Sequence, residues 1–566
     1  MGEQFSGRLF YVLLVSILDA ALLSWVLVLW YRRSVRKLMR EPARSDSPNA
    51  RAPIDPLMFD SSEPSSGFTL IEAGSTDGPA LLTGGTRRQL RRLVIAYAVG
   101  AMLHSAVITF LTMRADAPAA RRLAWFIAWW ANAWPVVPTL IALLVLDRPK
   151  SVRLALWYLV GGASTTAALT LAVQLTRGSV NSAALTNAYL TILRLVLVAA
   201  FPVLLLLLTG WRRVRAVTPL ALAMTLLFGI GLQVSWTLFV NALDVPVLRS
   251  VILKLAARTS PAVTSYVPFM LLSLPVGWIA WRLLQLITSG YDRKRFSDVQ
   301  LLVDCWWLIV TAEEIASTLW LHYGPAAAAG GLVAFGAYRA GVALVLSIGS
   351  LGGANGRRLL LLRVFGYERR TESLFDRIAQ QWRFHGPVQL IGGVDLAERT
   401  IDPGDVLAFL GGTLRDRYVG SVDEIDQRID NLDNGRDPDG RFRVNEVYCH
   451  DDTWRPTLEA LLDASDRVLM DLRSFSKKNA GCIFELEQLI RKKPTTDVVF
   501  VCDRSTDVAL LERILGQTWI AAASEGHARG DARVSIVRIE RQSRRELGIL
   551  MRRLLADASP VTASPP

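Results

Sequence analysis

The chain has 566 residues, of which 51% are hydrophobic and 20% charged, and its formal net charge is +13. This composition excludes a simple soluble enzyme, a disordered chain and a small disulfide scaffold. Residues 357–566 carry 32 basic and 33 acidic side chains, so the whole positive excess lies earlier in the chain. A phosphate-binding surface would need that excess on the charged C-terminal part, which argues against nucleic acid as a partner.

Long apolar segments before residue 355 predict a multi-pass α-helical membrane domain of about nine helices. Each segment is close to the ~20 residues that a helix needs to cross lipid. We expect a first transmembrane helix in residues 1–31 and a polytopic domain over 93–352. The nine candidate spans lie near residues 9–31, 93–113, 123–146, 154–175, 189–210, 218–240, 266–287, 301–322 and 326–349.

Basic residues between these segments predict the orientation in the membrane. The segment 32–92 is basic at both ends and rich in Ser, Pro, Gly and Asp between them, which predicts a flexible cytoplasmic linker. The N-terminus is then outside and the C-terminal part cytoplasmic, in the inner membrane of a bacterium, with the lipid bilayer as the first partner. The four cysteines lack disulfide or metal-ligand spacing, which indicates reduced thiols.

Charged residues within the predicted spans allow two interpretations. Glu313 and Glu314 lie in the eighth span and Arg339 in the ninth, and Asp304 is also intramembrane. Buried charges in lipid are costly, so they pair with one another or line a polar pathway. The two glutamates and Arg339 therefore form either an ion pair between adjacent helices or part of a conduction or ligand path.

Residues 357–556 predict a doubly wound α/β domain, because short apolar runs alternate with amphipathic segments. The last residues, 557–566, predict a disordered tail. The expected strands are 359–365, 388–392, 444–449, 467–471, 498–502 and 534–539. The expected helices are 372–382, 406–414, 454–464, 482–490, 508–515 and 544–555.

A candidate site follows the strand that ends at Asp471. The next loop supplies Ser474, Phe475, Ser476 and Asn479, and Gly481 opens a helix whose first turn or so includes Glu485. In open α/β sheets, ligands bind at the carboxyl ends of the strands. Glu485 would there face a ribose, or it would only be a carboxylate stabilised by the helix dipole.

The stretch from Leu458 to Leu486 resembles the region by which Toll/interleukin-1 receptor (TIR) domains are identified. The matching elements are a helix ending in Ser465, the strand Val468-Leu-Met-Asp471, the Ser-Phe-Ser loop and Gly481-Cys-Ile-Phe-Glu-Leu486. The same residues are similar to nucleoside 2-deoxyribosyltransferases, through Asp466, Asp471, Gly481 and Glu485. Gly481 stands where TIR domains carry Trp, and Asp471 where they prefer Ser. The resemblance covers about 40 residues closely.

The resemblance implies a flavodoxin-like, TIR-like fold and a carboxylate at Glu485 that acts on an N-glycosidic bond. It implies NAD or a related nucleotide as substrate, no cofactor, and homo-oligomers formed through the TIR-like domain. Binding residues would be Asp471, Ser474, Phe475, Ser476, Asn479, Gly481 and, at the end of the first strand, Gly366. Such a protein would be a membrane-anchored signalling or effector protein, including one in bacterial defence. The alternatives are a non-catalytic nucleotide- or protein-binding module that regulates a membrane channel or transporter, and a transporter in its own right.

Overall fold

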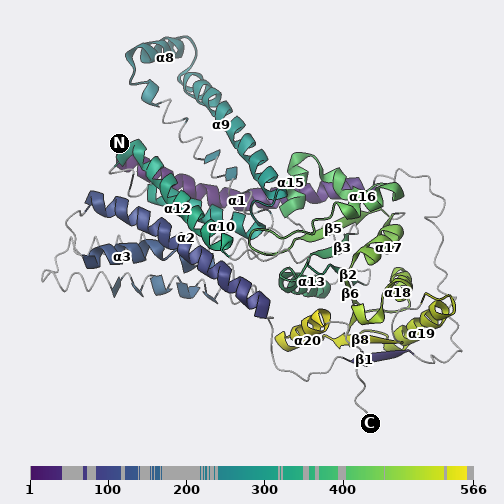
Figure 1. Cartoon of the computed structure of the whole chain (residues 1–566). Coiled ribbons are helices and arrows are strands. Elements are labelled where there is room, and N and C mark those ends of the chain that lie inside the picture. Colours follow the sequence, from purple (N-terminus) through teal and green to yellow (C-terminus); the bar gives the residue numbers. More distant parts are fainter. Residues whose placement is uncertain are drawn as a thin grey trace. The chain divides into compact units, whose positions relative to one another are not determined.

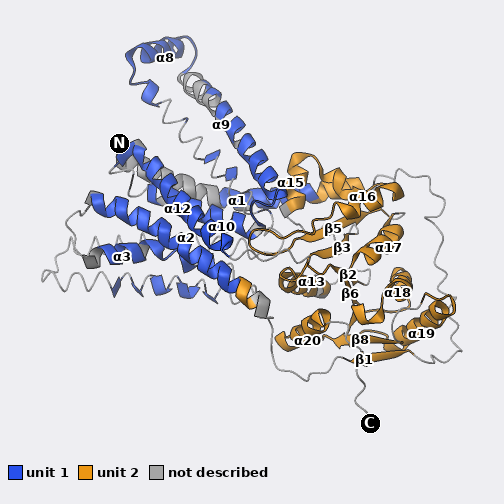
Figure 2. Cartoon of the chain, in the orientation of Figure 1, with its two compact units in different colours: residues 1–31, 90–350 blue, residues 32–89, 351–566 orange. Residues whose placement is uncertain are grey.

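The computed structural model describes most of the chain in two compact units (Figure 2). Unit 1 comprises residues 1–31 and 90–350, and unit 2 comprises residues 32–89 and 351–566. The described residues are 2–40, 68–72, 84–116, 122–137, 139–140, single positions between 153 and 235, 240–315, 319, 323–348, 356–363, 369–392, 403–450, 453–527 and 532–556.

Unit 1 is helical wherever the structure describes its regular elements. The helices that lie wholly or mostly in unit 1 are α1 (Gly2–Arg40), α2 (Gly84–Asp116), α3 (Arg122–Ala133), α8 (Pro246–Arg258), α9 (Pro261–Asp292), α10 (Asp298–Glu314) and α12 (Ala327–Ser347), with the 3₁₀ turn η4 (Gly324–Ala326) before α12. The first helix continues past residue 31 through a basic stretch, since Arg and Lys are good helix formers. A capping box formed by Ser297 and Gln300 fixes the start of α10.

Two described helices are long and apolar enough to span a bilayer, Arg87–Arg114 within α2 and Ala327–Ser347. A third apolar stretch, Val299–Ala312, is shorter than a span. The described residues therefore do not support the nine-helix membrane domain, of which they supply two candidate spans. The predicted segments 154–175, 189–210 and 218–240 lie largely outside the described residues.

The ion pair of Arg339 has a different acidic partner from either glutamate expected from the sequence. Arg339 on α12 pairs with Asp304 on α10, and the Tyr338 hydroxyl donates to the same carboxylate over 3.0 Å. Asp304 lies about three turns before the end of α10. Identifying it as the partner of Arg339 requires knowledge of how α10 and α12 pack, which the sequence alone does not provide. This contact favours the structural role of Arg339 over a pathway.

Unit 2 is built on an eight-stranded parallel sheet with the order β1-β8-β7-β6-β2-β3-β5-β4 (Figure 1). Its strands are β1 (Thr69–Glu72), β2 (Leu359–Arg363), β3 (Val388–Gly392), β4 (Tyr418–Val419), β5 (Val444–Cys449), β6 (Arg467–Asp471), β7 (Val498–Cys502) and β8 (Arg533–Arg538). Its helices are α13 (Arg369–Trp382), α15 (Pro403–Gly411), α16 (Ile425–Asp430), α17 (Trp454–Ala464), α18 (Ala480–Lys492), α19 (Val508–Ser524) and α20 (Arg544–Leu555). The 3₁₀ turns η5 (Leu414–Arg417), η6 (Val422–Glu424) and η7 (Thr495–Asp497) connect them.

Helices cover both faces of this sheet. Leu360, Val468 and Phe500 face a core closed by α17, α18 and α19, whereas Leu359 and Leu469 face a second core closed by α13 and α20. Successive residues of one strand thus enter different cores, which is why the central strands are apolar without alternation. The predicted doubly wound α/β architecture is confirmed at this level.

The strand order corrects the flavodoxin-like expectation. In chain order the six long strands are β2, β3, β5, β6, β7 and β8, and their order in space is third, second, first, fourth, fifth, sixth. This is the Rossmann order, whereas a flavodoxin-like sheet is ordered second, first, third, fourth, fifth. The difference arises because the chain returns after β3 to add β5 outside it, so β2 pairs with β6.

The linker expected to be flexible contributes the edge strand β1. Between α1 and α2 the described residues of this linker are 68–72, and β1 pairs in parallel with β8, with Thr69 opposite Arg533. Phe68, Leu70 and Ile71 are apolar residues within a polar segment, and Phe68 and Leu70 pack against the core closed by α19. The rest of residues 41–83 lies outside the described residues.

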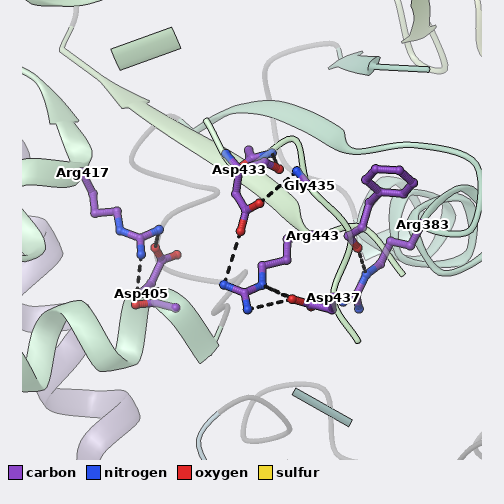
Figure 3. A network of polar contacts seen from close by, with 10 residues as sticks. Arg383, Asp405, Arg417, Asp433, Gly435, Asp437 and Arg443 are labelled. Carbon is purple, nitrogen blue, oxygen red and sulfur yellow. Dashed lines mark hydrogen bonds and ion pairs between the residues drawn. The ribbon is translucent and has the colours of Figure 1, made fainter. Parts of the chain in front are cut away.

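Buried ion pairs hold the long connection that leads into β5 (Figure 3). Arg443 donates from Nε to Asp437 over 3.0 Å, and its Nη1 lies 3.3 Å from Asp433. The Asp433 carboxylate also accepts from the Gly435 amide over 3.3 Å. These contacts fix the irregular segment before the amino end of β5.

Candidate functional site

Strands β3 and β5 lie on one side of β2, and β6, β7 and β8 lie on its other side. Polar side chains come together where β2 and β6 meet. The two strands pair along their whole length, with Arg363 opposite Asp471 as the last pair. In a Rossmann-type order this is the topological switch point, at whose carboxyl edge ligands bind. The sequence-derived site therefore lies at the position that the topology favours for a ligand.

Helix α18 brings Glu485 to this edge. The helix begins at Ala480, so Glu485 is in its second turn, where the sequence predicted the first turn or so. Its side chain is 3% exposed, and its Oε2 atom has no hydrogen-bond partner among the described residues. Because helix-dipole stabilisation fades beyond the first turn, the dipole alone does not account for a buried carboxyl group here.

Burial dominates the electrostatics of Glu485. Loss of solvation raises the pKa of its carboxyl group from 4.5 to about 8, while the positive charge of Arg363 acts in the opposite direction. At pH 7 only about one such group in ten is ionised. The site thus holds a neutral carboxylic acid that an additional positive charge would ionise.

The Asp471 carboxylate binds a residue of the loop that follows β6. Both of its carboxylate oxygens accept from Arg473, Oδ1 from Nε over 2.8 Å and Oδ2 from Nη2 over 2.7 Å. Both side chains are buried. The pair forms a rigid, two-bonded clamp that sets the direction of the loop as it leaves β6.

Ser474 follows this clamp with a positive φ of 65°. Its backbone amide donates to the Ser505 hydroxyl over 3.0 Å, and the two hydroxyl oxygens are 3.2 Å apart. Ser505 in turn donates to the Asp503 carboxylate after β7. Left-handed backbone at a non-glycine residue is strained, and such strain concentrates at functional sites.

The remaining sequence-derived residues take different places. Phe475 is fully buried in the core, so its ring lies under the loop and not over a ligand position. Ser476 and Asn479 bind each other, since the Asn479 side-chain oxygen accepts from the Ser476 amide over 2.9 Å. Gly481 is half-buried in the first turn of α18. Gly366 lies outside the described residues.

Three residues at this edge were missed from the sequence: Arg363, Arg473 and Ser505. Arg363 ends an otherwise unbroken run of leucines, and a charge at the carboxyl end of a buried strand is a signal that could have been used. Ser505 belongs to the turn after β7, and only the pairing of β6 with β7 brings it to Ser474.

The described residues hold no group of three or more His, Cys, Asp or Glu side chains able to bind a metal ion. All four cysteines are free, buried thiols, as predicted. No protein-family model matches the chain, and comparison with curated proteins gives no significant match.

Proposed function

We propose that unit 2 hydrolyses the N-glycosidic bond of NAD or a related nucleotide, with Glu485 as the central carboxyl group. The observation that carries the proposal is a buried carboxyl oxygen without a hydrogen-bond partner at the switch point of a Rossmann-ordered sheet. A buried polar atom left unsatisfied costs about 1–3 kcal/mol, and a ligand is one reason for a protein to retain that cost.

The chemistry follows from charge. When the bond from C1′ of the ribose to nicotinamide breaks, its electron pair neutralises the pyridinium nitrogen and positive charge develops on the ribose. Ionised Glu485 stabilises that charge, water adds its oxygen to C1′, and the water proton is released. The pyridinium of the bound substrate favours the ionised carboxylate, which offsets the effect of burial on its pKa.

We propose that the chain is attached to a membrane, which suits a signalling or effector role for this activity. We propose a multi-pass bacterial inner-membrane protein whose N-terminus is outside. The support comes from the apolar segments of the sequence, two of which are candidate spans in the described residues. We propose the cytoplasmic side for unit 2, because the basic segments 32–40 and 87–92 flank the linker that supplies β1.

One observation favours a second candidate, a non-catalytic module that binds a nucleotide or protein and regulates the membrane part. Glu485 is almost inaccessible, and Phe475 lies below the loop surface. A site closed in this way suits a sensor that opens when a ligand binds.

The test uses the full chain in detergent with NAD, and follows nicotinamide release by chromatography. Glu485→Gln keeps the shape of the side chain but cannot ionise, so we expect release to fall by about 10²–10³-fold. Glu487→Gln is the matched control, because Glu487 lies on the same helix, is half-buried and is not part of the site. Its rate should equal that of the wild type.

Two outcomes would contradict hydrolysis. Equal release from Glu485→Gln and wild type would remove Glu485 from the chemistry. NAD binding without any release would favour the non-catalytic module.

A further inference from the structure

The edge strand β1 is far in sequence from the strand with which it pairs. Strands β6, β7 and β8 are joined in turn through α18 and α19, but β1 precedes them by most of the chain. It lies between α1 and α2, in the segment that follows the first predicted membrane helix. Its parallel pairing with β8 is therefore not imposed by a short covalent connection.

A small set of contacts defines this pairing. The Thr69 amide donates to the Ala532 carbonyl over 2.9 Å, and the Phe68 ring lies 5.7 Å from the ring of Trp519 on α19. Glu72 pairs with Arg538 over 3.4 Å, but both side chains are more than half exposed, so this pair contributes little. Phe68 and the backbone ladder carry most of the specificity.

The strand is also easy to release. It has four residues, its two ends are exposed, and Leu70 and Ile71 are only half-buried. Short edge elements with few buried contacts open at low free-energy cost. Release uncovers the backbone groups of β8, and an uncovered strand edge pairs readily with another chain.

We propose that the Phe68–Glu72 segments are exchanged between two copies of this chain, so that β1 of each copy completes the sheet of the other. A second copy offers the same partners for Phe68 and Thr69, and exchange of an identical element is a low-cost route to dimers. The eleven residues 73–83 between β1 and α2 reach at most about 40 Å when extended, and residues 41–67 reach farther. Confinement of both copies to one membrane raises their effective concentration.

This interface lies at the β8 edge, apart from the site at β2 and β6, so it stands independently of the proposed hydrolysis. The test introduces one cysteine into each of two differently tagged full-length copies, Thr69→Cys in one and Arg533→Cys in the other. These residues are exposed and directly opposite in the register, which places them in the range for a disulfide. The native cysteines are buried and do not interfere.

The copies are produced together, oxidised in the membrane and separated without reductant. The control pair is Thr69→Cys with Arg504→Cys, because Arg504 is 89% exposed in the turn after β7 and is not opposite β1 in the register. We expect about tenfold more cross-linked heterodimer than in the control pair, because exchange places the two cysteines in contact. Adding Phe68→Ala to the Thr69→Cys copy should reduce the yield to the control level.

A third sample carries both cysteines in one chain and reports pairing within a copy. If that chain closes its own disulfide while the mixed copies give no more than the control, the proposal is overturned and β1 completes only its own sheet.

Discussion

Two clusters of buried ionisable side chains in unit 2 differ in how many of their polar atoms have a partner. At the amino end of β5, the Arg443 guanidinium contacts both Asp433 and Asp437 (Figure 3). At the carboxyl edge of β2 and β6, Glu485 is equally buried, yet one of its oxygens has no hydrogen-bond partner among the described residues. In the first cluster the ion pairs hold a loop in place. In the second, a carboxyl oxygen remains that can bind a ligand.

The largest effect expected from this comparison is on the satisfied cluster. Arg443→Ala leaves the Asp433 and Asp437 carboxylates without their shared cation, so unit 2 should lose about 3–5 kcal/mol of stability. The measurement is urea unfolding of the full chain in detergent, followed by proteolysis of a C-terminally tagged protein. Arg443→Lys is the control, since it keeps the charge but cannot bind both carboxylates in the same way, and should lose less. An unchanged midpoint for Arg443→Ala would mean that the network does not hold the connection.

The sequence was sufficient for the interior of the sheet. The strands 388–392, 444–449, 467–471 and 498–502 were predicted with the bounds that the structure shows, because apolar runs buried on both faces leave a clear local signal. The position of Glu485 near the end of β6 follows from the same signal and from the connection through the next loop.

Properties that depend on pairing between distant segments were not predictable in this way. The place of β5 outside β3, the strand β1 and the partner of Arg339 all depend on contacts far apart in sequence. The depth of Glu485 in α18 was missed because the helix begins two residues earlier than its apolar pattern. The clamp of Asp471 by Arg473 requires a loop conformation that residue types alone do not fix.

The second effect, of intermediate size, is a change with pH in the free energy of unfolding of unit 2, caused by Glu485. The folded state holds the Glu485 proton up to a pKa of about 8, whereas the unfolded chain releases it near 4.5. The stabilisation from the neutral acid is therefore complete below pH 4.5 and is lost as pH rises through 8, at about 1.4 kcal/mol per pH unit for this one group. Glu485→Gln keeps a neutral side chain throughout.

Unfolding at pH 5, 7 and 9 measures this difference. Relative to the wild type, Glu485→Gln should gain a few kcal/mol at pH 9 while remaining inactive. If the two proteins respond equally to pH, Glu485 is solvated or paired in solution, and the contrast with the Arg443 cluster disappears.

The smallest effect tests whether strain at the site is retained for function. Ser474 and Gln542 both have positive φ, 65° and 52°, but only Ser474 lies beside Asp471 and Ser505. Glycine removes the steric cost of this conformation, so Gln542→Gly should stabilise unit 2 by about 0.5–1 kcal/mol with nucleotide binding unchanged. Ser474→Gly gains the same backbone relief and loses the hydroxyl contact with Ser505, so its stability should change less while nucleotide affinity, measured by titration calorimetry, falls. Equal nucleotide affinity in both glycine variants would show that the left-handed turn at Ser474 only closes the loop. The proposed binding residues would then be Glu485 and the charged side chains beside it.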